Sequence, residues 1–226
     1  MDLGGFQKLS LLNYPDRTAC VVFTTGCNFC CPWCHNTGLV KGETQRIRAE
    51  EIISYLQKRK GMLDGICISG GEPLIQKDLS HFLRCVKDLG YAVKLDTNGS
   101  FPDRLEAMIE ESLIDYIAMD VKNTPEKYAE TIGLAAAPVE KILRSAEILR
   151  RSGIAYEFRT TVIREFHTPA DIDAIAQLLK GASVWYLQPF LDAPEVKQHG
   201  LHAPDPEEME KFGSIGTRFL KTIVRK

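Results

Sequence analysis

The chain has 226 residues, of which 44% are hydrophobic and 26% are charged, as is ordinary for a globular protein with a sizeable core. Its formal net charge of −2 gives no support for a nucleic-acid-binding surface. No apolar run approaches the roughly 20 residues that a membrane helix needs. The first residues also lack the basic and apolar segments of a signal peptide. We therefore expect a cytoplasmic protein with no membrane and no nucleic-acid partner.

Short apolar runs alternate with longer amphipathic stretches, which is typical of βα units and a parallel sheet. The predicted strands are 19–24, 65–69, 92–95, 115–119, 155–162 and 183–187, and the predicted helices are 49–59, 79–89, 102–112, 139–151, 169–179 and 207–219. Six such units are too few for an eight-stranded barrel. They fit an α/β fold with a partial (β/α)6 barrel of parallel strands, although periodicity does not exclude a doubly wound sheet. We expect one domain, 1–226, with a loose tail at 220–226.

Polar clusters follow the carboxyl ends of most predicted strands. Barrels assemble their active sites at that end from several strands. These clusters are the cysteine loop 24–36, Gly70-Gly71-Glu72-Pro73, Asp96-Thr97-Asn98-Gly99, Asp120-Val121-Lys122 and Gln188. Each could be an ordinary turn or a solvated charge pair when taken alone.

Four of the seven cysteines lie in the loop 24–36, which favours metal ligands over disulfides. Using all of Cys27, Cys30, Cys31 and Cys34 would give a tetrahedral zinc site. The spacing Cys27-x3-Cys31-x2-Cys34 leaves Cys30 out. This second spacing is favoured because adjacent cysteines in an extended chain point to opposite sides. Three thiolates can hold three irons of a cubane cluster and leave the fourth iron without a protein ligand.

The three-cysteine spacing, with Trp33 before the last cysteine, resembles the signature of the radical S-adenosylmethionine (SAM) superfamily. The run through His35-Asn36 is similar to that of the activating enzymes of glycyl-radical enzymes. The chain is most similar to the activating proteins of anaerobic ribonucleoside-triphosphate reductase, through Gly5-Phe6, Lys8, Ser10-Leu11, Tyr14-Pro15 and Val22-Phe23-Thr24. Cys30 departs from that pattern, which has arginine or another non-cysteine residue there, and is either a bystander or a spare ligand.

The resemblance implies a partial barrel in which Cys27, Cys31 and Cys34 hold a [4Fe-4S] cluster. It implies reductive cleavage of SAM, with the electron coming from a flavodoxin- or ferredoxin-type donor. The resulting 5′-deoxyadenosyl radical would take a hydrogen from a glycine of a partner glycyl-radical enzyme. The implied partner is anaerobic ribonucleotide reductase.

The resemblance also assigns SAM-binding residues. The Gly70-Gly71-Glu72-Pro73 turn would meet the methionine amino group, because glycines allow close backbone approach and a glutamate pairs with an ammonium. Lys122 would contact the SAM carboxylate, and Trp33 would face the adenine. Asp96 and Asn98 complete this set, and Asp96 and Asp120 would also bind a monovalent cation.

Other residues give weaker indications. If the face of strand 155–162 that carries Arg159 lines the barrel, the guanidinium needs an anionic partner, such as the SAM carboxylate or a peptide; otherwise Arg159 is a surface residue. Gln188 is a similar case. The resemblance places Asn36 near the substrate glycine, and places Tyr128 and Gly133 in a loop beside the mouth of the site, although an ordinary surface loop explains these two equally well. The histidines at 81, 167, 199 and 202 show no ligand spacing and are expected on the surface or in loops.

Three other functions remain open at this point. A zinc-binding interaction module would use all four cysteines of the loop. An electron-transfer iron–sulfur protein would use Cys30 as a fourth cluster ligand. A radical SAM enzyme could also act on a small molecule instead of a protein.

Overall fold

The computed structural model describes residues 1–225 and divides them into two compact units. Unit 1 comprises Met1–Asn28, Asn36–Thr97 and Phe101–Ile117, and unit 2 comprises Phe29–His35, Asn98–Ser100 and Ala118–Lys226. The boundary between the units therefore falls inside the cysteine loop and again inside the Asp96-Thr97-Asn98-Gly99 segment. The single domain expected from the sequence stays a prediction.

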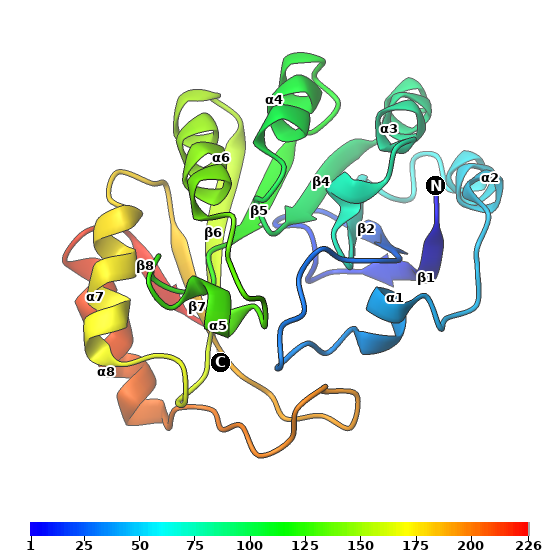
Figure 1. The fold of residues 1–226 in the computed structure, drawn as a ribbon. Coiled ribbons are helices and arrows are strands. Elements are labelled where there is room, and N and C mark those ends of the chain that lie inside the picture. The colour runs from blue at the N-terminus through cyan, green and yellow to red at the C-terminus, as the bar shows by residue number, and fades with distance from the viewer. Residues whose placement is uncertain (226) are drawn as a thin grey trace. The chain divides into compact units, whose positions relative to one another are not determined.

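Unit 1 is built on four strands whose order in the sheet follows the chain (Figure 1). β1 (Leu3–Ser10) pairs antiparallel with β2 (Ala19–Thr24), and β2, β3 (Gly65–Gly70) and β4 (Ala92–Thr97) are parallel. The three parallel strands are mostly buried, β2 most of all, as expected for parallel strands covered on both faces. β1 was not predicted, because its sequence LGGFQKLS lacks the alternation that identifies a half-buried strand.

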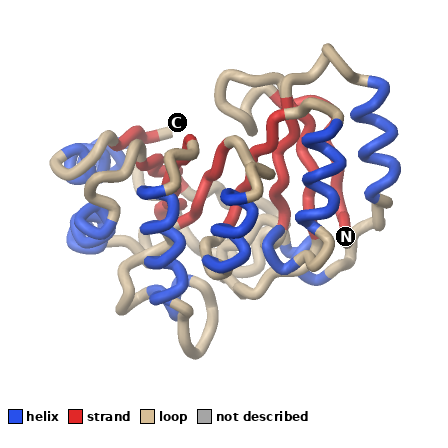
Figure 2. The backbone as a smooth tube through the Cα atoms, turned by 90° about the horizontal axis from the view of Figure 1, so that it is seen from above, coloured by secondary structure: helices blue, strands red, loops and turns tan. Residues whose placement is uncertain are grey.

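Three helices of unit 1, α2 (Ala49–Lys58), α3 (Leu79–Asp88) and α4 (Pro102–Glu110), each bury apolar residues on one side. The buried residues of α3 are Leu79, Phe82, Leu83 and Val86, which recur at the three- and four-residue spacing of one helix face. The tube view shows helices of this unit running alongside its strands (Figure 2). The helical elements are α1 (Thr37–Lys41), α2 (Ala49–Lys58), the 3-10 helix η1 (Pro73–Ile75), α3 (Leu79–Asp88) and α4 (Pro102–Glu110).

Within unit 2 the described strand pairs are parallel. β5 (Tyr116–Asp120) crosses from one unit to the other, and just beyond it the Val121 N–H donates to the Arg159 carbonyl at 2.8 Å. β6 (Ala155–Val162) pairs with β7 (Trp185–Pro189), and β7 pairs with β8 (Thr222–Val224). The helices are α5 (Tyr128–Thr131), α6 (Val139–Arg151), α7 (Pro169–Leu178) and α8 (Pro206–Thr217). Capping boxes begin both α7 and α8.

Residues 222–224 form β8, where we expected a loose tail. The segment is held by a charge pair as well as by strand pairing. Arg225 Nη2 lies 3.1 Å from Glu157 Oε1, and Glu157 is 1% exposed. The Arg225 guanidinium also stacks 4.0 Å from the ring centre of Tyr186. No local pattern predicts this contact, because it joins positions 68 residues apart. Residue 226 lies outside the described residues.

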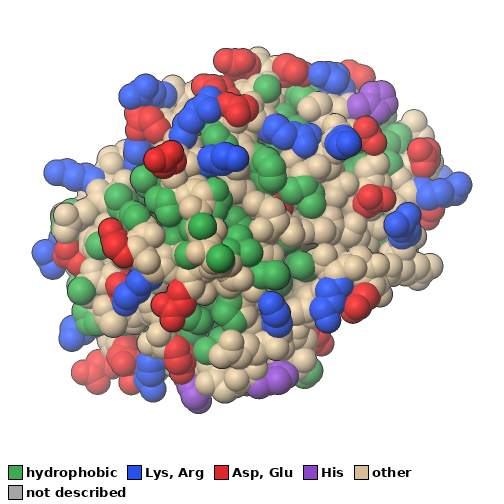
Figure 3. Space-filling model, viewed as in Figure 1, with side chains coloured by type: hydrophobic (Ala, Val, Ile, Leu, Met, Phe, Trp, Pro, Cys, Tyr) green, Lys and Arg blue, Asp and Glu red, His purple; other side chains and the backbone are tan. Residues whose placement is uncertain are grey.

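The predicted α/β class with a mostly parallel sheet is confirmed. The six predicted strands are β2 to β7, and each end differs by two residues or fewer. Positive and negative side chains are interspersed on the face in Figure 3, in agreement with the small net charge. None of the helices in residues 1–225 has the length and apolar character required to span a membrane.

Candidate active site

In unit 1, the Gly70-Gly71-Glu72-Pro73 turn is hydrogen-bonded to the beginning of the cysteine loop. The Glu72 N–H donates to the Gly26 carbonyl at 2.9 Å. A Cβ atom at Gly71 would lie 1.8 Å from the same oxygen, so a side chain cannot be accommodated at position 71. The glycine is therefore required for the turn to approach the loop this closely.

The carboxylate of Glu72 is buried and oriented. Its Oε1 accepts from the Leu74 N–H at 3.0 Å and from the Thr97 hydroxyl at 2.8 Å, and the residue is 0% exposed. Pro73 opens η1 directly after it. Two donors on one oxygen fix the direction of the carboxylate.

In unit 2, the backbone of Cys30 is held on both sides while its side chain is exposed. Its N–H donates to the Ile132 carbonyl at 2.9 Å, and its carbonyl accepts from Lys197 Nζ at 3.2 Å. A Cβ at Gly133, where φ is +67°, would lie 2.5 Å from the Cys30 carbonyl oxygen. Gly133 therefore allows a close approach that keeps Cys30 in place.

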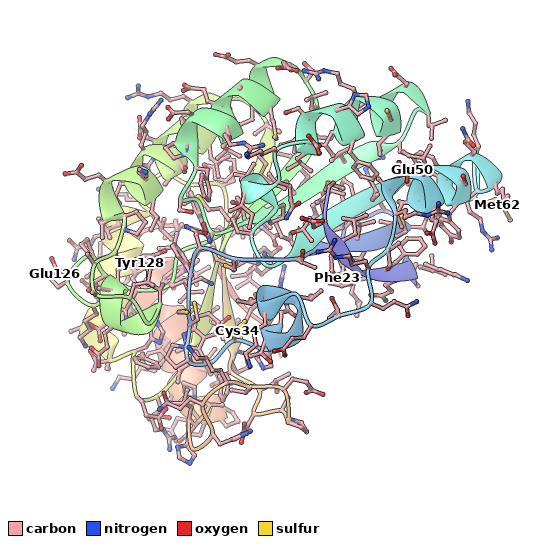
Figure 4. All side chains as sticks on the ribbon, turned by 45° about the vertical axis from the view of Figure 1, so that its right-hand side comes forward. Phe23, Cys34, Glu50, Met62, Glu126 and Tyr128 are labelled. Atoms are coloured by element: carbon pink, nitrogen blue, oxygen red, sulfur yellow. The ribbon has the colours of Figure 1, made fainter. Side chains whose placement is uncertain are left out.

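Cys31 differs from its neighbour in burial. It is 8% exposed, and burial raises the pKa of its thiol, whereas the charge of Lys122 acts in the opposite direction. Cys34 follows, with its N–H 3.2 Å from the Cys31 carbonyl, and lies on the loop labelled in Figure 4. Lys122 is thus the neighbour whose charge favours a thiolate at Cys31, although burial has the larger effect on the pKa.

Trp33 lies between these two cysteines in the chain, and both its ring nitrogen and the face of its ring are in contact with other residues. Its Nε1 donates to the Thr131 carbonyl at 3.1 Å. Lys122 Nζ lies 4.6 Å from the centre of the ring, which is a cation–π contact. These two contacts hold the indole ring in a fixed position beside Lys122.

Asp120 lies between two cations at the end of β5. Its Oδ2 is 3.2 Å from Lys122 Nζ, and its Oδ1 is 3.1 Å from Arg159 Nε. Burial opposes ionisation, but the charges of Lys122 and Arg159 hold the pKa of Asp120 below its usual value. Burial would likewise lower the pKa of Lys122, but Asp120 outweighs it and the pKa is raised.

Arg159 therefore has an anionic partner within the chain. Its side chain is 15% exposed, so it is not the outward surface arginine that the sequence left open. The sequence pointed to the SAM carboxylate or a peptide as the anion, whereas the described contact is to Asp120. The face of β6 that carries Arg159 also carries the buried Glu157.

Tyr128 and His167 hold the backbone of Lys122, and neither role was predicted. The Lys122 N–H donates to the Tyr128 hydroxyl at 3.1 Å, and His167 Nε2 donates to the Lys122 carbonyl at 2.8 Å. Tyr128 is 2% exposed at the start of α5 (Figure 4), and His167 is 3% exposed. The surface interpretation was wrong for Tyr128, whereas His167 lies in a loop, as expected, but is buried there. A proline two residues after His167, opening α7, gave no hint that the preceding loop turns inward.

The remaining predicted residues have separate local roles. Asn36 Nδ2 donates to the Gly70 carbonyl at 3.2 Å in unit 1. Asn98 Oδ1 accepts from the N–H and the hydroxyl of Ser100 in unit 2. Asp96 accepts from Lys94, and Gln188 pairs with Thr161 in the β6–β7 ladder.

The donors fit an iron–sulfur cluster by their chemistry. In residues 1–225 no three His, Cys, Asp or Glu side chains are gathered as a metal site. However, the thiols of Cys31 and Cys34 are free, and Lys122 favours the thiolate form of Cys31. Such soft thiolate donors suit iron–sulfur clusters.

Comparison with known proteins gives one consistent family. The model of the radical SAM superfamily matches residues 21–179. A protein of Methanocaldococcus jannaschii, provisionally named a glycyl-radical enzyme activating enzyme, is 33% identical over 228 residues, covering 98% of this chain and 94% of the relative. A pyruvate formate-lyase-activating enzyme of Listeria monocytogenes is 31% identical over 133 residues, 53% of each chain.

A solved structure is similar in fold. The radical SAM methyltransferase from Sphaerobacter thermophilus superimposes with a TM-score of 0.75 and 19% identity, covering 96% of this chain and 68% of that one. At this identity the likeness concerns the fold alone.

The buried histidine predicts a specific pH dependence. Burial lowers the pKa of His167, so its imidazole is neutral when folded, whereas the unfolded chain takes up the proton as pH falls through 6.5. Stability should therefore fall below that pH, with a contribution to the slope of up to about 1.4 kcal/mol per pH unit. Urea unfolding of the wild type and of His167→Gln between about pH 7.5 and 5.5 measures this, and the variant should have the shallower slope.

The exposed His81 on α3 provides the matched control, because His81→Gln should leave the slope unchanged. Equal slopes for the wild type and His167→Gln would contradict a neutral, buried imidazole.

Proposed function

This chain belongs to the radical SAM superfamily, and from that premise we propose that it is an activating enzyme that forms a glycyl radical on a partner enzyme. Membership of the superfamily makes the chain an enzyme and implies a [4Fe-4S] cluster and SAM as its cofactors. The observation that carries the proposal is the similarity to the Methanocaldococcus jannaschii protein, which extends over 98% of the chain. The shorter match to a pyruvate formate-lyase-activating enzyme points to the same class.

We assign the cluster to Cys27, Cys31 and Cys34. The exposure of the Cys30 side chain and the two bonds that fix its backbone support leaving it out. When bound, the cluster supplies one electron for the reductive cleavage of SAM. The chain's own contribution is to keep one metal position open for SAM, as an open position separates catalytic from structural metal sites.

The charged side chains are suited to the two polar ends of the methionine group of SAM. Glu72, oriented by Leu74 and Thr97, is placed to accept from the amino group, with Gly70, Gly71 and Pro73 shaping the turn. Lys122 and Arg159 share Asp120 and leave a net positive charge that suits the carboxylate. We also assign Trp33 to the adenine, and Asp96 and Asn98 to SAM binding.

The proposed partner is anaerobic ribonucleotide reductase, supported by the lead-in residues between Gly5 and Thr24. Asn36 would lie near the substrate glycine, where its bond to Gly70 keeps it in place. A flavodoxin- or ferredoxin-type donor would supply the electron. Radical chemistry requires that water be kept away, which a site opened only to a peptide loop would achieve.

Replacing single cysteines tests the ligand set. After anaerobic reconstitution, Cys30→Ser should keep wild-type iron and sulfide content, whereas Cys31→Ser should lose most of both, because a hydroxyl is a poor ligand for this cluster. Iron and sulfide assays together with the visible absorption give the readout. Loss of metal in Cys30→Ser equal to that in Cys31→Ser would favour a four-cysteine site and a non-radical function.

Detecting a glycyl radical on the partner enzyme tests which partner this chain activates. Reduced, cluster-loaded protein mixed with SAM and anaerobic ribonucleotide reductase should yield a glycyl-radical signal in electron paramagnetic resonance (EPR). Replacing the target glycine of the reductase by alanine should remove the signal.

Pyruvate formate-lyase serves as the parallel partner in this experiment. A radical on pyruvate formate-lyase alone would reassign the partner. SAM cleavage with no radical on either protein would contradict the activating function.

A further inference from the structure

Lys94 is a buried lysine in the middle of β4, and none of the roles described above uses it. Its neighbours Val93 and Leu95 are fully buried, and Lys94 itself is 2% exposed. A buried ammonium is unfavourable unless a carboxylate accepts its hydrogen bond. Lys94 Nζ donates to Oδ1 of Asp96, which stands two residues further on the same face of the strand.

The described contacts of the ammonium also include a thiol and an aromatic ring, neither of which is a carboxylate. Cys67 Sγ lies 3.9 Å from Nζ, and the centre of the Tyr116 ring lies 6.0 Å away. A thiol and an aromatic face stabilise a cation weakly compared with a carboxylate. Lys94 is thus the fixed counter-ion of Asp96.

Asp120 is the second carboxylate expected to bind a monovalent cation, and it is also paired with cationic side chains. Each of its oxygens faces a cationic donor, Lys122 Nζ at Oδ2 and Arg159 Nε at Oδ1. The three side chains together carry one negative and two positive charges. A further cation at this carboxylate would meet net repulsion.

We infer that this chain needs no monovalent cation at Asp96 and Asp120, because its own cationic side chains take that place. Lys94 supplies the charge at Asp96, and Lys122 with Arg159 supplies it at Asp120. An ammonium on a covalent stem offers three donors and cannot diffuse away, whereas an alkali ion would have to displace it from the carboxylate. The inference concerns the chain alone and does not depend on which partner is activated.

Thermal unfolding of the cluster-free protein tests the inference without using its activity. Wild-type midpoints should coincide in potassium, sodium and tetramethylammonium chloride at equal concentration, because the bulky tetramethylammonium ion cannot enter an alkali-ion site. A saturable rise of the wild-type midpoint with potassium or sodium, removed by Asp96→Asn, would overturn the inference.

Replacing Lys94 by an uncharged residue should make the unfolding midpoint depend on potassium or sodium. In Lys94→Met, potassium or sodium should raise the unfolding midpoint by about 3 °C or more over tetramethylammonium, by mass action on the folded state. The double variant Lys94→Met/Asp96→Asn should lose this response, and Lys58→Met, at an exposed lysine of α2, should never show it.

A folded Lys94→Met that responds equally to all three salts would contradict the role of Lys94. If that variant does not fold, the wild-type salt comparison decides by itself.

Discussion

The carboxylate of Asp120, held between Lys122 and Arg159, is the interaction on which the site in unit 2 depends. Burying the charges of Lys122 and Arg159 is unfavourable unless each is paired, so their distances from the half-buried Asp120 are fixed closely. Lys122 in turn is fixed through its backbone by Tyr128 and His167 and through its ammonium by the ring of Trp33. The position of the tryptophan within the cysteine loop is thereby tied to the end of β5.

In unit 1, the residues of the predicted site are positioned largely by contacts with the backbone. Gly71 lets the turn after β3 approach Gly26 at the entrance to the cysteine loop, and Glu72 is then oriented by two donors on one oxygen. Taken by itself, unit 1 thus presents an oriented carboxylate, which suits the amino group of the proposed ligand SAM.

The local hydrophobic pattern of the sequence predicted most of the fold. Contacts between residues far apart in the chain account for much of what it did not predict. The strands β2 to β7 are apolar runs bounded by turns, so periodicity identified them within two residues. β1 is glycine-rich and polar, and β8 has only three residues, so neither carries a readable period. The roles of the motif residues around Asp120 were predicted from the resemblance to the radical SAM superfamily. Their long-range partners, Arg159 at 39 residues from Asp120 and His167 at 45 from Lys122, follow only from the fold. Lys94 was visible as a charge inside an apolar strand, but its pairing with Asp96 needed the structure.

The central claim is that three cysteines hold a cluster with one metal position left for SAM. The most direct measurement is EPR of the anaerobically reconstituted, reduced protein with and without SAM. The account predicts a reduced [4Fe-4S] signal whose shape changes when SAM is added, because SAM would bind the open iron. A cluster signal that SAM leaves unchanged would mean that a fourth ligand closes the site, and would contradict the assignment.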